Sequence, residues 1–359
     1  MTIVMKKRKT AKEGVTAPPP TITQPEIVRT LADLARIAGV STGTVSRALA
    51  DKSIVNSETR ERIQSLAKKH DFRPNQMASK LRSRRTGFVG VVIPLGHERR
   101  QHISDPFFLT LLGHLADELA ECGYDLMLSR VIPDGTKDWL EKVTRSGMVD
   151  GVLVIGQSDQ FDIIEEVAAQ YEPLVIWGHQ RAHQRHCVVG TDNLAGGRLA
   201  VEHLVATGAR KLLFMGDAAG IEIQMRLEGA KAAAAAAGIA LKHVKITLAG
   251  EDMGPQIEKS LSSRFSYDGI VAASDLIALS ALSALHRIGK RIPQDVQVVG
   301  FDDLPLSSYS APPLTTIRQE ISRGAKLMVE KLKERMGGKN TPSVVMPPIL
   351  VVRESTRSL

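Results

Sequence analysis

The sequence has few cysteines, few aromatic residues and no long apolar run. Cys122 and Cys187 are its two cysteines in 359 residues, too few for a disulfide framework. No apolar run approaches the ~20 residues that a membrane span needs, and the first thirty residues lack the apolar core of a signal peptide. These absences exclude the disulfide-rich secreted class and the membrane class, and we expect a cytosolic protein.

The motifs of common catalytic sites are missing as well. The sequence contains no phosphate-binding loop, no dinucleotide-binding glycine fingerprint and no nucleophile elbow. Potential metal ligands cluster between His179 and Cys187, but their spacing fits no standard metal site. Asp302 and Asp303 are neighbours that would point to opposite faces of a strand, which makes a poor acid/base pair. We expect no enzyme activity, no cofactor and no bound metal.

The charge that is present is unevenly distributed along the chain. Residues 1–86 carry 18 Lys and Arg against 7 Asp and Glu, whereas residues 87–359 carry 29 against 32. A small basic module on a larger, slightly acidic body is typical of a polyanion-binding head joined to a body with another task. The alternative from charge alone is a solubilising basic tail.

The basic part divides into a leader, a helical unit and a short connecting segment. Residues 1–29 combine a Lys/Arg run with three consecutive prolines and predict a disordered leader. Residues 30–73 place apolar residues at helical spacing in three bursts, the pattern of a compact three-helix unit with a helix-turn-helix. Polar residues suited to capping precede the helices, and a glycine suits the first turn: Thr30, Ser41, Asn56 and Gly39. An unrelated helical hairpin would show the same spacing.

From residue 87 onward, short β-branched runs alternate with helical stretches. The predicted buried strands are 89–93, 126–128, 152–155, 174–177, 212–215, 270–273 and 296–301. This alternation predicts an α/β body of doubly wound parallel sheets flanked by helices. So many strands fit best in two lobes, and a ligand between the lobes is the first hypothesis, because pockets favour such interfaces.

Several segments together resemble the LacI/GalR family of bacterial, lactose-repressor-type transcription regulators. The headpiece of that family resembles residues 30–81, chiefly at 39–47, 59–60 and 72–75. The body signatures of the family resemble, in order, residues 90–94, 105–108, 192–197, 226–229, 274–275, 299–303 and 312–317. The resemblance covers about residues 30–355.

The resemblance implies a domain organisation. The expected parts are a helix-turn-helix headpiece at 30–73, a hinge helix and linker at 74–86, and a two-lobed, periplasmic-binding-protein-like body at 87–359, which binds effector and dimerises. Within the body, we expect a first lobe at about 87–190 and 318–341, and a second lobe at about 191–317 and 342–359.

The resemblance also implies how DNA is bound. The second headpiece helix would enter the major groove, and the residues expected at the DNA are Thr30, Leu31, Ser41, Thr42, Gly43, Thr44, Ser46, Arg47, Asn56, Thr59, Asn75, Ala78, Leu81 and Arg82. Gly43 departs from many relatives because it has no side chain to reach a base, so Thr42 and Arg47 must carry more of the base readout. Arg47 is expected to pair with guanine, the alternative being a phosphate contact.

The hinge segment is expected to fold only against a second subunit and DNA. It is too short to stay helical alone in water. The leucine that matches Leu81 in the family wedges into the minor groove and kinks the duplex. The alternative is a leucine packed on its own body. A homodimer on a near-palindromic operator follows from this arrangement.

The effector pocket is expected at residues that follow strands of the body and at Arg226 and Asp275, which match positions where members of the family bind a small ligand. The candidates are Phe107, Phe108, Trp177, His179, Asp192, Arg226, Asp275 and Asp303. Aromatic faces would stack on a sugar ring, while arginine and carboxylates would bind hydroxyls. The alternatives are two core phenylalanines and, for Asp192 and Asp303, structural caps.

We therefore expect a repressor that a sugar or glycoside effector releases from a palindromic operator. Alternatives are a regulator whose purine or other small ligand is a corepressor, a free sugar-binding protein, and an enzyme on the same architecture.

Overall fold

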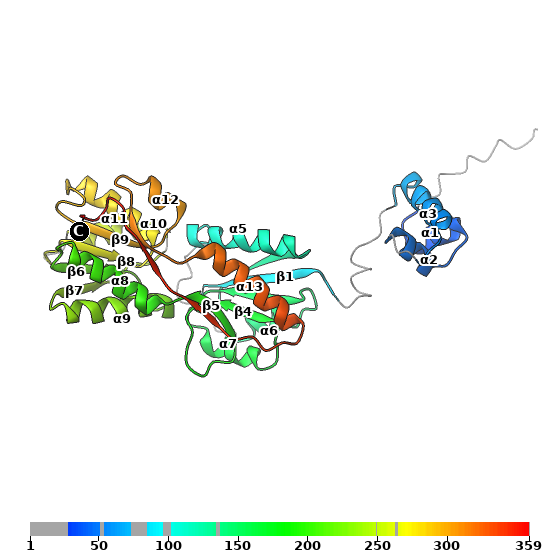
Figure 1. The fold of residues 1–359 in the computed structure, drawn as a ribbon, viewed down its shortest axis with the longest axis horizontal. Coiled ribbons are helices and arrows are strands. Elements are labelled where there is room, and N and C mark those ends of the chain that lie inside the picture. Colours follow the sequence, from blue (N-terminus) through cyan, green and yellow to red (C-terminus); the bar gives the residue numbers. More distant parts are fainter. Residues whose placement is uncertain are drawn as a thin grey trace, which may run out of the picture. The chain divides into compact units, whose positions relative to one another are not determined.

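The computed structural model describes residues 28–50, 54–72, 85–95, 102–133, 137–248, 250–262 and 265–358. The chain divides between residues 83 and 84 into two compact units, and Figure 1 labels most of their elements. In the described part of the chain, no helix is both long enough and apolar enough to cross a membrane.

The first unit is a three-helix headpiece made of α1 (Leu31–Ala38), α2 (Thr42–Leu49) and α3 (Ser57–Lys69). Each helix starts at a cap that the sequence predicts. The side chains of Thr30, Ser41 and Asn56 accept hydrogen bonds from backbone N–H groups three residues later, at 3.1, 3.1 and 2.8 Å. Gly39 ends α1 in the left-handed conformation with φ 65°. These four predictions are confirmed.

Side chains of α3 close the C-terminal ends of the other two helices. Arg62 Nη2 donates to the Ala38 carbonyl at 3.1 Å, and Gln64 Nε2 donates to the Ala48 carbonyl at 3.3 Å. Beneath these contacts lies an apolar core that includes Leu34, Val45 and Ile63, all fully buried. The headpiece thus satisfies helix-end carbonyls that would otherwise lack partners.

The first lobe of the body holds one six-stranded sheet in the order β11-β5-β4-β3-β1-β2, with every pair parallel. Its strands are β1 (Phe88–Pro94), β2 (Asp125–Val131), β3 (Gly151–Ile155), β4 (Leu174–Trp177), β5 (Cys187–Thr191) and β11 (Val344–Met346). Its helices are α5 (Pro106–Glu121), α6 (Trp139–Thr144), α7 (Phe161–Ala168) and α13 (Ile321–Met336).

The second lobe holds a sheet in the order β12-β10-β9-β8-β6-β7, parallel except for the β10–β12 edge pair. Its strands are β6 (Lys211–Met215), β7 (Ala240–Val244), β8 (Gly269–Ala272), β9 (Gln297–Asp302), β10 (Thr315–Arg318) and β12 (Ile349–Val351). Its helices are α8 (Asn193–Ala206), α9 (Ile221–Ala236), α10 (Gly250–Leu261), α11 (Asp275–Arg287) and α12 (Pro305–Tyr309). The predicted α/β class and parallel sheets are confirmed.

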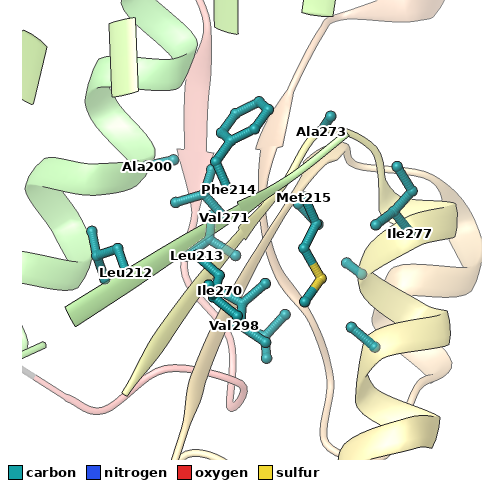
Figure 2. Close-up of a cluster of buried hydrophobic side chains, with 14 of the residues drawn as sticks. Ala200, Leu212, Leu213, Phe214, Met215, Ile270, Val271, Ala273, Ile277 and Val298 are labelled. Atoms are coloured by element: carbon teal, nitrogen blue, oxygen red, sulfur yellow. The ribbon is translucent and has the colours of Figure 1, made fainter. Parts of the chain in front are cut away.

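Helices cover both faces of each sheet, so the central strands are buried on both sides. Figure 2 shows Ala200 of α8 and Ile277 of α11 on opposite sides of the strands that carry Leu212 to Met215, Ile270, Val271 and Val298. Such burial explains why these strands are continuous apolar runs in the sequence.

The chain passes between the lobes three times: after β5, after β10 and after β11 (Figure 1). The third passage differs from the expected boundary at 341/342. Val344 to Met346 pair in parallel with Val189 to Thr191 and so extend the first sheet, and the passage falls between Met346 and Ile349. Backbone pairing of this short edge strand, which has no clear sequence pattern, moves the boundary.

Candidate functional site

The helix that the sequence predicts to face DNA is α2, and its two sides differ. Val45 and Ala48 are fully buried in the headpiece core. Thr42 and Arg47 are exposed on the other side. A Cβ added at Gly43 would lie 3.7 Å from Nη2 of Arg47, so the guanidinium extends back over the first turn of α2. The guanidinium of Arg47 therefore lies near the start of the helix, within ordinary contact distance of position 43.

The other expected DNA contacts surround this helix or lie outside the described residues. The Ser41 and Thr44 hydroxyls are 2.9 Å apart within the cap of α2, and Ser46 is half-buried. Thr30, Asn56 and Thr59 lie at the starts of α1 and α3, and Leu31 packs against the headpiece core. Asn75, Ala78, Leu81 and Arg82 lie outside the described residues.

The effector candidate is a cleft of about 120 Å³ between the two lobes. Leu95 and Gly156 line it from the first lobe, just after β1 and β3, and Ala273 lines it from the second, just after β8. In both sheets the strand order reverses beside the first strand, between β1 and β3 and between β6 and β8. Ligands of open α/β sheets bind outside the carboxyl ends of strands at such reversal points.

Three aromatic side chains form the first-lobe wall of the cleft. Phe107 lies with its ring centroid 5.9 Å from Phe108 and also 5.9 Å from Trp177, in tilted and edge-on arrangements. All three line the cleft. Trp177 is held from behind by α13, because a Cβ added at Gly324 would lie 2.2 Å from its ring. These three expected residues are brought together, and both phenylalanines also belong to the hydrophobic cluster of the lobe.

Arg226 is the buried cation of the second-lobe wall. Its guanidinium donates from Nε to Oδ1 of Asn193 at 2.8 Å and from Nη1 to the Ala273 carbonyl, and it lies 3.7 Å from the Phe301 ring centroid. Its Nη1 is 3.8 Å from Oδ1 of Asp302. Burial lowers the pKa of Arg226, and the charge of Asp302 opposes that shift.

Two glycines let α8 and α9 approach closely enough for the Arg226–Asn193 contact. A Cβ added at Gly197 would lie 1.9 Å from the Arg226 carbonyl oxygen, and one at Gly229 would lie 1.9 Å from that of Leu194. Only glycine fits a backbone approach this close. The sequence motifs around Asn193 and Arg226 therefore lie on two helices that cross each other, and each motif supplies one glycine to the contact.

The structure corrects two of the expected carboxylates by one residue each. Asp275 is fully buried, and it accepts hydrogen bonds from Leu304 N, Ser307 Oγ and Thr316 Oγ1, whereas the preceding Ser274 lines the cleft. Burial raises the pKa of Asp275 to about 6. Its carboxylate therefore joins the start of α11 to α12 and β10.

Asp303 is the second correction. Its carboxylate bridges Arg318 Nε at 2.7 Å and Arg353 Nη2 at 2.6 Å, which ties the second lobe to the start of an inter-lobe passage. Asp302 lines the cleft instead. Burial raises its pKa well above the ordinary value, while Arg226 opposes that shift. Both residues have positive φ, 122° and 57°, a strained backbone of the kind that clusters at ligand sites.

His179 and Asp192 are not among the residues that line the cleft. The His179 carbonyl accepts a hydrogen bond from Gln157 Nε2 at 2.9 Å, and burial lowers the pKa of its imidazole. Asp192 caps α8 by accepting from Ala195 N at 2.9 Å, as the structural alternative predicts. Asp192 lies at the first passage between the lobes, and His179 follows β4 in the first lobe.

Besides Ser274 and Asp302, four polar lining residues were not predicted from the sequence: Asp105, Ser158, Glu222 and Gln319. Glu222 bridges the lobes, because its Oε1 accepts from the backbone N of Gln157 at 3.2 Å. Gln319 donates to Asp302 from the second passage. Asp105 lies in the segment 105–108 that carries the resemblance and precedes α5. Of these four residues, Asp105 is therefore the one that could have been predicted from the sequence.

Comparisons with known proteins agree with this geometry. The model of the bacterial regulatory proteins of the lacI family matches residues 30–75, and that of the periplasmic binding protein-like domain matches residues 201–356. The ribose operon repressor of Halalkalibacterium halodurans is 30% identical over 335 residues, which cover 91% of this chain and 97% of that protein. The chain belongs to the LacI family.

Solved structures of LacI-family regulators share the fold over most of their length. The lac repressor dimer bound to operator and the anti-inducer ONPF matches with a TM-score of 0.80 and 25% identity, covering 92% of this chain and 99% of that one. The complex of the regulator CelR with cellobiose matches with a TM-score of 0.64 and 28% identity, covering 91% and 100%. The predicted family and function class, a DNA-binding transcription regulator, are confirmed.

Proposed function

We propose that this LacI-family regulator represses transcription as a homodimer bound to a near-palindromic operator, and that a small sugar binding in the inter-lobe cleft releases it. The observation that carries the proposal is the cleft itself. It combines an aromatic wall from one lobe with Arg226, Ser274 and Asp302 from the other, in a chain that also carries a helix-turn-helix. The named relatives support it: one is a ribose operon repressor, one binds cellobiose and one is a dimer on its operator.

The chemistry of the cleft suits a hydroxyl-rich ring. Phe107 and Trp177 offer apolar faces, while Asp302 and Glu222 offer acceptors and Ser274 offers a hydroxyl. Acidic residues outnumber Arg226 in the lining, which disfavours phosphorylated or carboxylated ligands. A sugar without an anionic group satisfies both conditions.

Release follows from linkage between the cleft and the operator. A sugar that touches both lobes binds the closed body more tightly than the open one, so it shifts the population toward closure. If closure is incompatible with the hinge conformation that grips DNA, operator affinity falls by about 5–150-fold, the ordinary range for such coupling. The hinge at 74–86 and the Leu81 wedge remain predictions within this mechanism.

We infer that the chain acts by binding and not by catalysis, and that it works in the cytoplasm, where a bacterial operator lies. The alternative with specific support is a corepressor such as a purine, since the aromatic wall would also stack a base. The sign of the ligand effect distinguishes it, because a corepressor tightens operator binding and an inducer weakens it.

The test is selection of sites from random duplex DNA by the purified full chain, followed by titration of the enriched DNA with a panel of pentoses, hexoses and purines. We expect a palindrome with a flexible pyrimidine–purine step at its centre, and release by a sugar. Enrichment that needs a purine would favour the corepressor alternative. No enrichment from a folded dimer under either condition would contradict the proposal.

A further inference from the structure

The inter-lobe cleft does not end at the aromatic wall. A second cavity of about 200 Å³ adjoins it, and Ser158 lines both. Its walls also come from both lobes. The first turn of α7 and Arg181 contribute from the first lobe, and the start of α9 contributes from the second. We call the cavity around Trp177 and Arg226 the inner compartment, and the one around Arg181 the outer compartment.

The two compartments share one strip of chain. Glu222 and Ile223 face the inner compartment, while Ile221 and Gln224 face the outer one, so successive residues of the first turns of α9 serve both. The hydrogen bond from Gln157 N to Glu222 crosses between the lobes at this junction. A ligand long enough to occupy both compartments would therefore pass Ser158 and remain in contact with both lobes throughout.

The outer compartment presents polar groups with unused hydrogen-bonding capacity. The Arg181 guanidinium lies 4.2 Å from the Phe161 ring centroid and is positioned by that ring. Among the described residues it has no hydrogen-bond or ion-pair partner, and the same holds for the side chains of Asp162 and Gln224. The helices α7 and α9 also start without side-chain caps here. Fork-like donors, amide groups and carboxylates are the groups that bind sugar hydroxyls.

We propose that the effector is a glycoside of at least two linked rings, with its first sugar in the inner compartment and its second sugar in the outer compartment. The inference rests on the proposed function, since it extends the same effector site. Two carboxylates, Asp159 and Asp162, face one arginine in the outer compartment, so its occupant carries hydroxyls and no anionic group. Arg181 and Gln224 are its specificity-determining residues, one from each lobe.

The test uses the full chain and binding calorimetry with glucose, galactose and ribose, and with maltose, cellobiose and lactose. We expect one linked sugar to bind at least 10-fold more tightly than its component monosaccharide. Arg181→Ala and Gln224→Ala should each weaken that linked sugar by about 10-fold, the loss of one strong hydrogen bond, and change the monosaccharide affinity less than twofold. Arg185→Ala, in the same loop but outside the lining, is the matched control.

The outcomes separate this inference from the proposed function. If monosaccharides bind and release the operator while no linked sugar binds more tightly, the inference fails and the proposed function stands. The same conclusion follows if Arg181→Ala and Gln224→Ala weaken both sugar lengths equally. If sugars of neither length bind a folded protein, both fail.

Discussion

At the scale of single residues, the buried carboxylates divide into those that hold the second lobe together and one that faces the cleft. The carboxylate oxygens of Asp275 and Asp303 accept hydrogen bonds from protein donors, whereas Asp302 faces the cleft beside Arg226. A buried carboxylate is tolerated when donors satisfy its lone pairs. Removing those donors destabilises the folded state, because the charge is then buried without partners. Neighbours in sequence therefore have separate roles.

Asp275 should make stability depend on pH in an unusual direction. Its folded pKa of about 6 exceeds its unfolded value of 3.8, so the folded state holds the proton more tightly. The contribution of this group is present below pH 4 and is lost as pH rises to about 6, a change of about 3 kcal/mol. We expect Asp275→Asn, which keeps the shape and most hydrogen bonds, to remove this dependence.

Urea unfolding of the wild type and Asp275→Asn between pH 4 and pH 7 measures this difference directly. The advantage of the wild type over the variant should shrink as pH rises from 4 to 6 and then stay constant. A difference that does not vary with pH would show that Asp275 is ionised throughout. Asp275→Ala serves as a second variant, and it should cost about 2–5 kcal/mol because three donors lose their acceptor.

Gly43 is the second residue for which the structure predicts whether a substitution stabilises or destabilises the fold. An alanine methyl there would make only ordinary contacts, at 3.7 Å from Arg47 Nη2 and Ser41 Oγ. Because alanine is the better helix former, Gly43→Ala should stabilise α2 by up to about 1 kcal/mol. Amide hydrogen exchange in peptides from residues 31–49 should slow in the full-length variant. Faster exchange would mean that the methyl disrupts the start of the helix, while Ala48→Gly on the buried side should accelerate exchange.

At the scale of elements, the crossing of α8 and α9 positions the second-lobe wall of the cleft. The two helices meet backbone to backbone at Gly197 and Gly229, and this contact sets Arg226 against Asn193. Side chains larger than hydrogen would separate the helices and withdraw the guanidinium from the cleft. The crossing thus links a packing requirement to ligand binding.

Gly197→Ala should therefore destabilise the body by at least about 1–3 kcal/mol, because its methyl would overlap the Arg226 carbonyl. Thermal or urea unfolding measures the loss. Gly113→Ala in α5 is the matched control, since its methyl would enter open space and should be neutral or stabilising by up to about 1 kcal/mol. Equal stability of the two variants would contradict the proposed role of the crossing.

The elements also show which parts of the fold a sequence can predict. Strands buried on both faces, such as β1, β3 and β9, are clear apolar runs. The strand β7 is mostly exposed, and β11 and β12 have three residues each, so their pairing depends on the rest of the sheet. The helix α10 is polar and contains Pro255, which hides its helical pattern.

The site was predictable as a region but not residue by residue. The aromatic wall and Arg226 were predictable, because Phe107, Phe108 and Arg226 lie within short motifs and Trp177 lies at the end of a buried strand. Whether Asp302 or Asp303 faces the cleft depends on Arg318 and Arg353, which are distant in the chain. Likewise Asp275 turns inward because Ser307 and Thr316 donate to it. Tertiary hydrogen bonds decide the direction of a side chain at a strand end. The hydrophobic periodicity of the sequence does not reveal these bonds.

At the scale of the whole molecule, the body has the architecture of a protein that can exchange between an open and a closed arrangement of its lobes. Two lobes are joined by three passages, and the hydrogen bond from Gln157 N to Glu222 links the facing walls of the cleft. A ligand shifts such an equilibrium only by its difference in affinity for the two states. A ligand that contacts both lobes, with Arg226 on one side and the aromatic wall on the other, would supply that difference.

The most direct test of the account measures operator binding by fluorescence anisotropy, with and without the sugar that the panel identifies, for the wild type, Arg226→Ala and Arg198→Ala. Arg198 is an exposed arginine of α8 outside the cleft lining and is the control. We predict that all three bind the operator equally without sugar, and that sugar releases the wild type and Arg198→Ala but leaves Arg226→Ala bound. Sugar-dependent release of a folded Arg226→Ala, at the wild-type concentration, would contradict the claim that the inter-lobe cleft controls DNA binding.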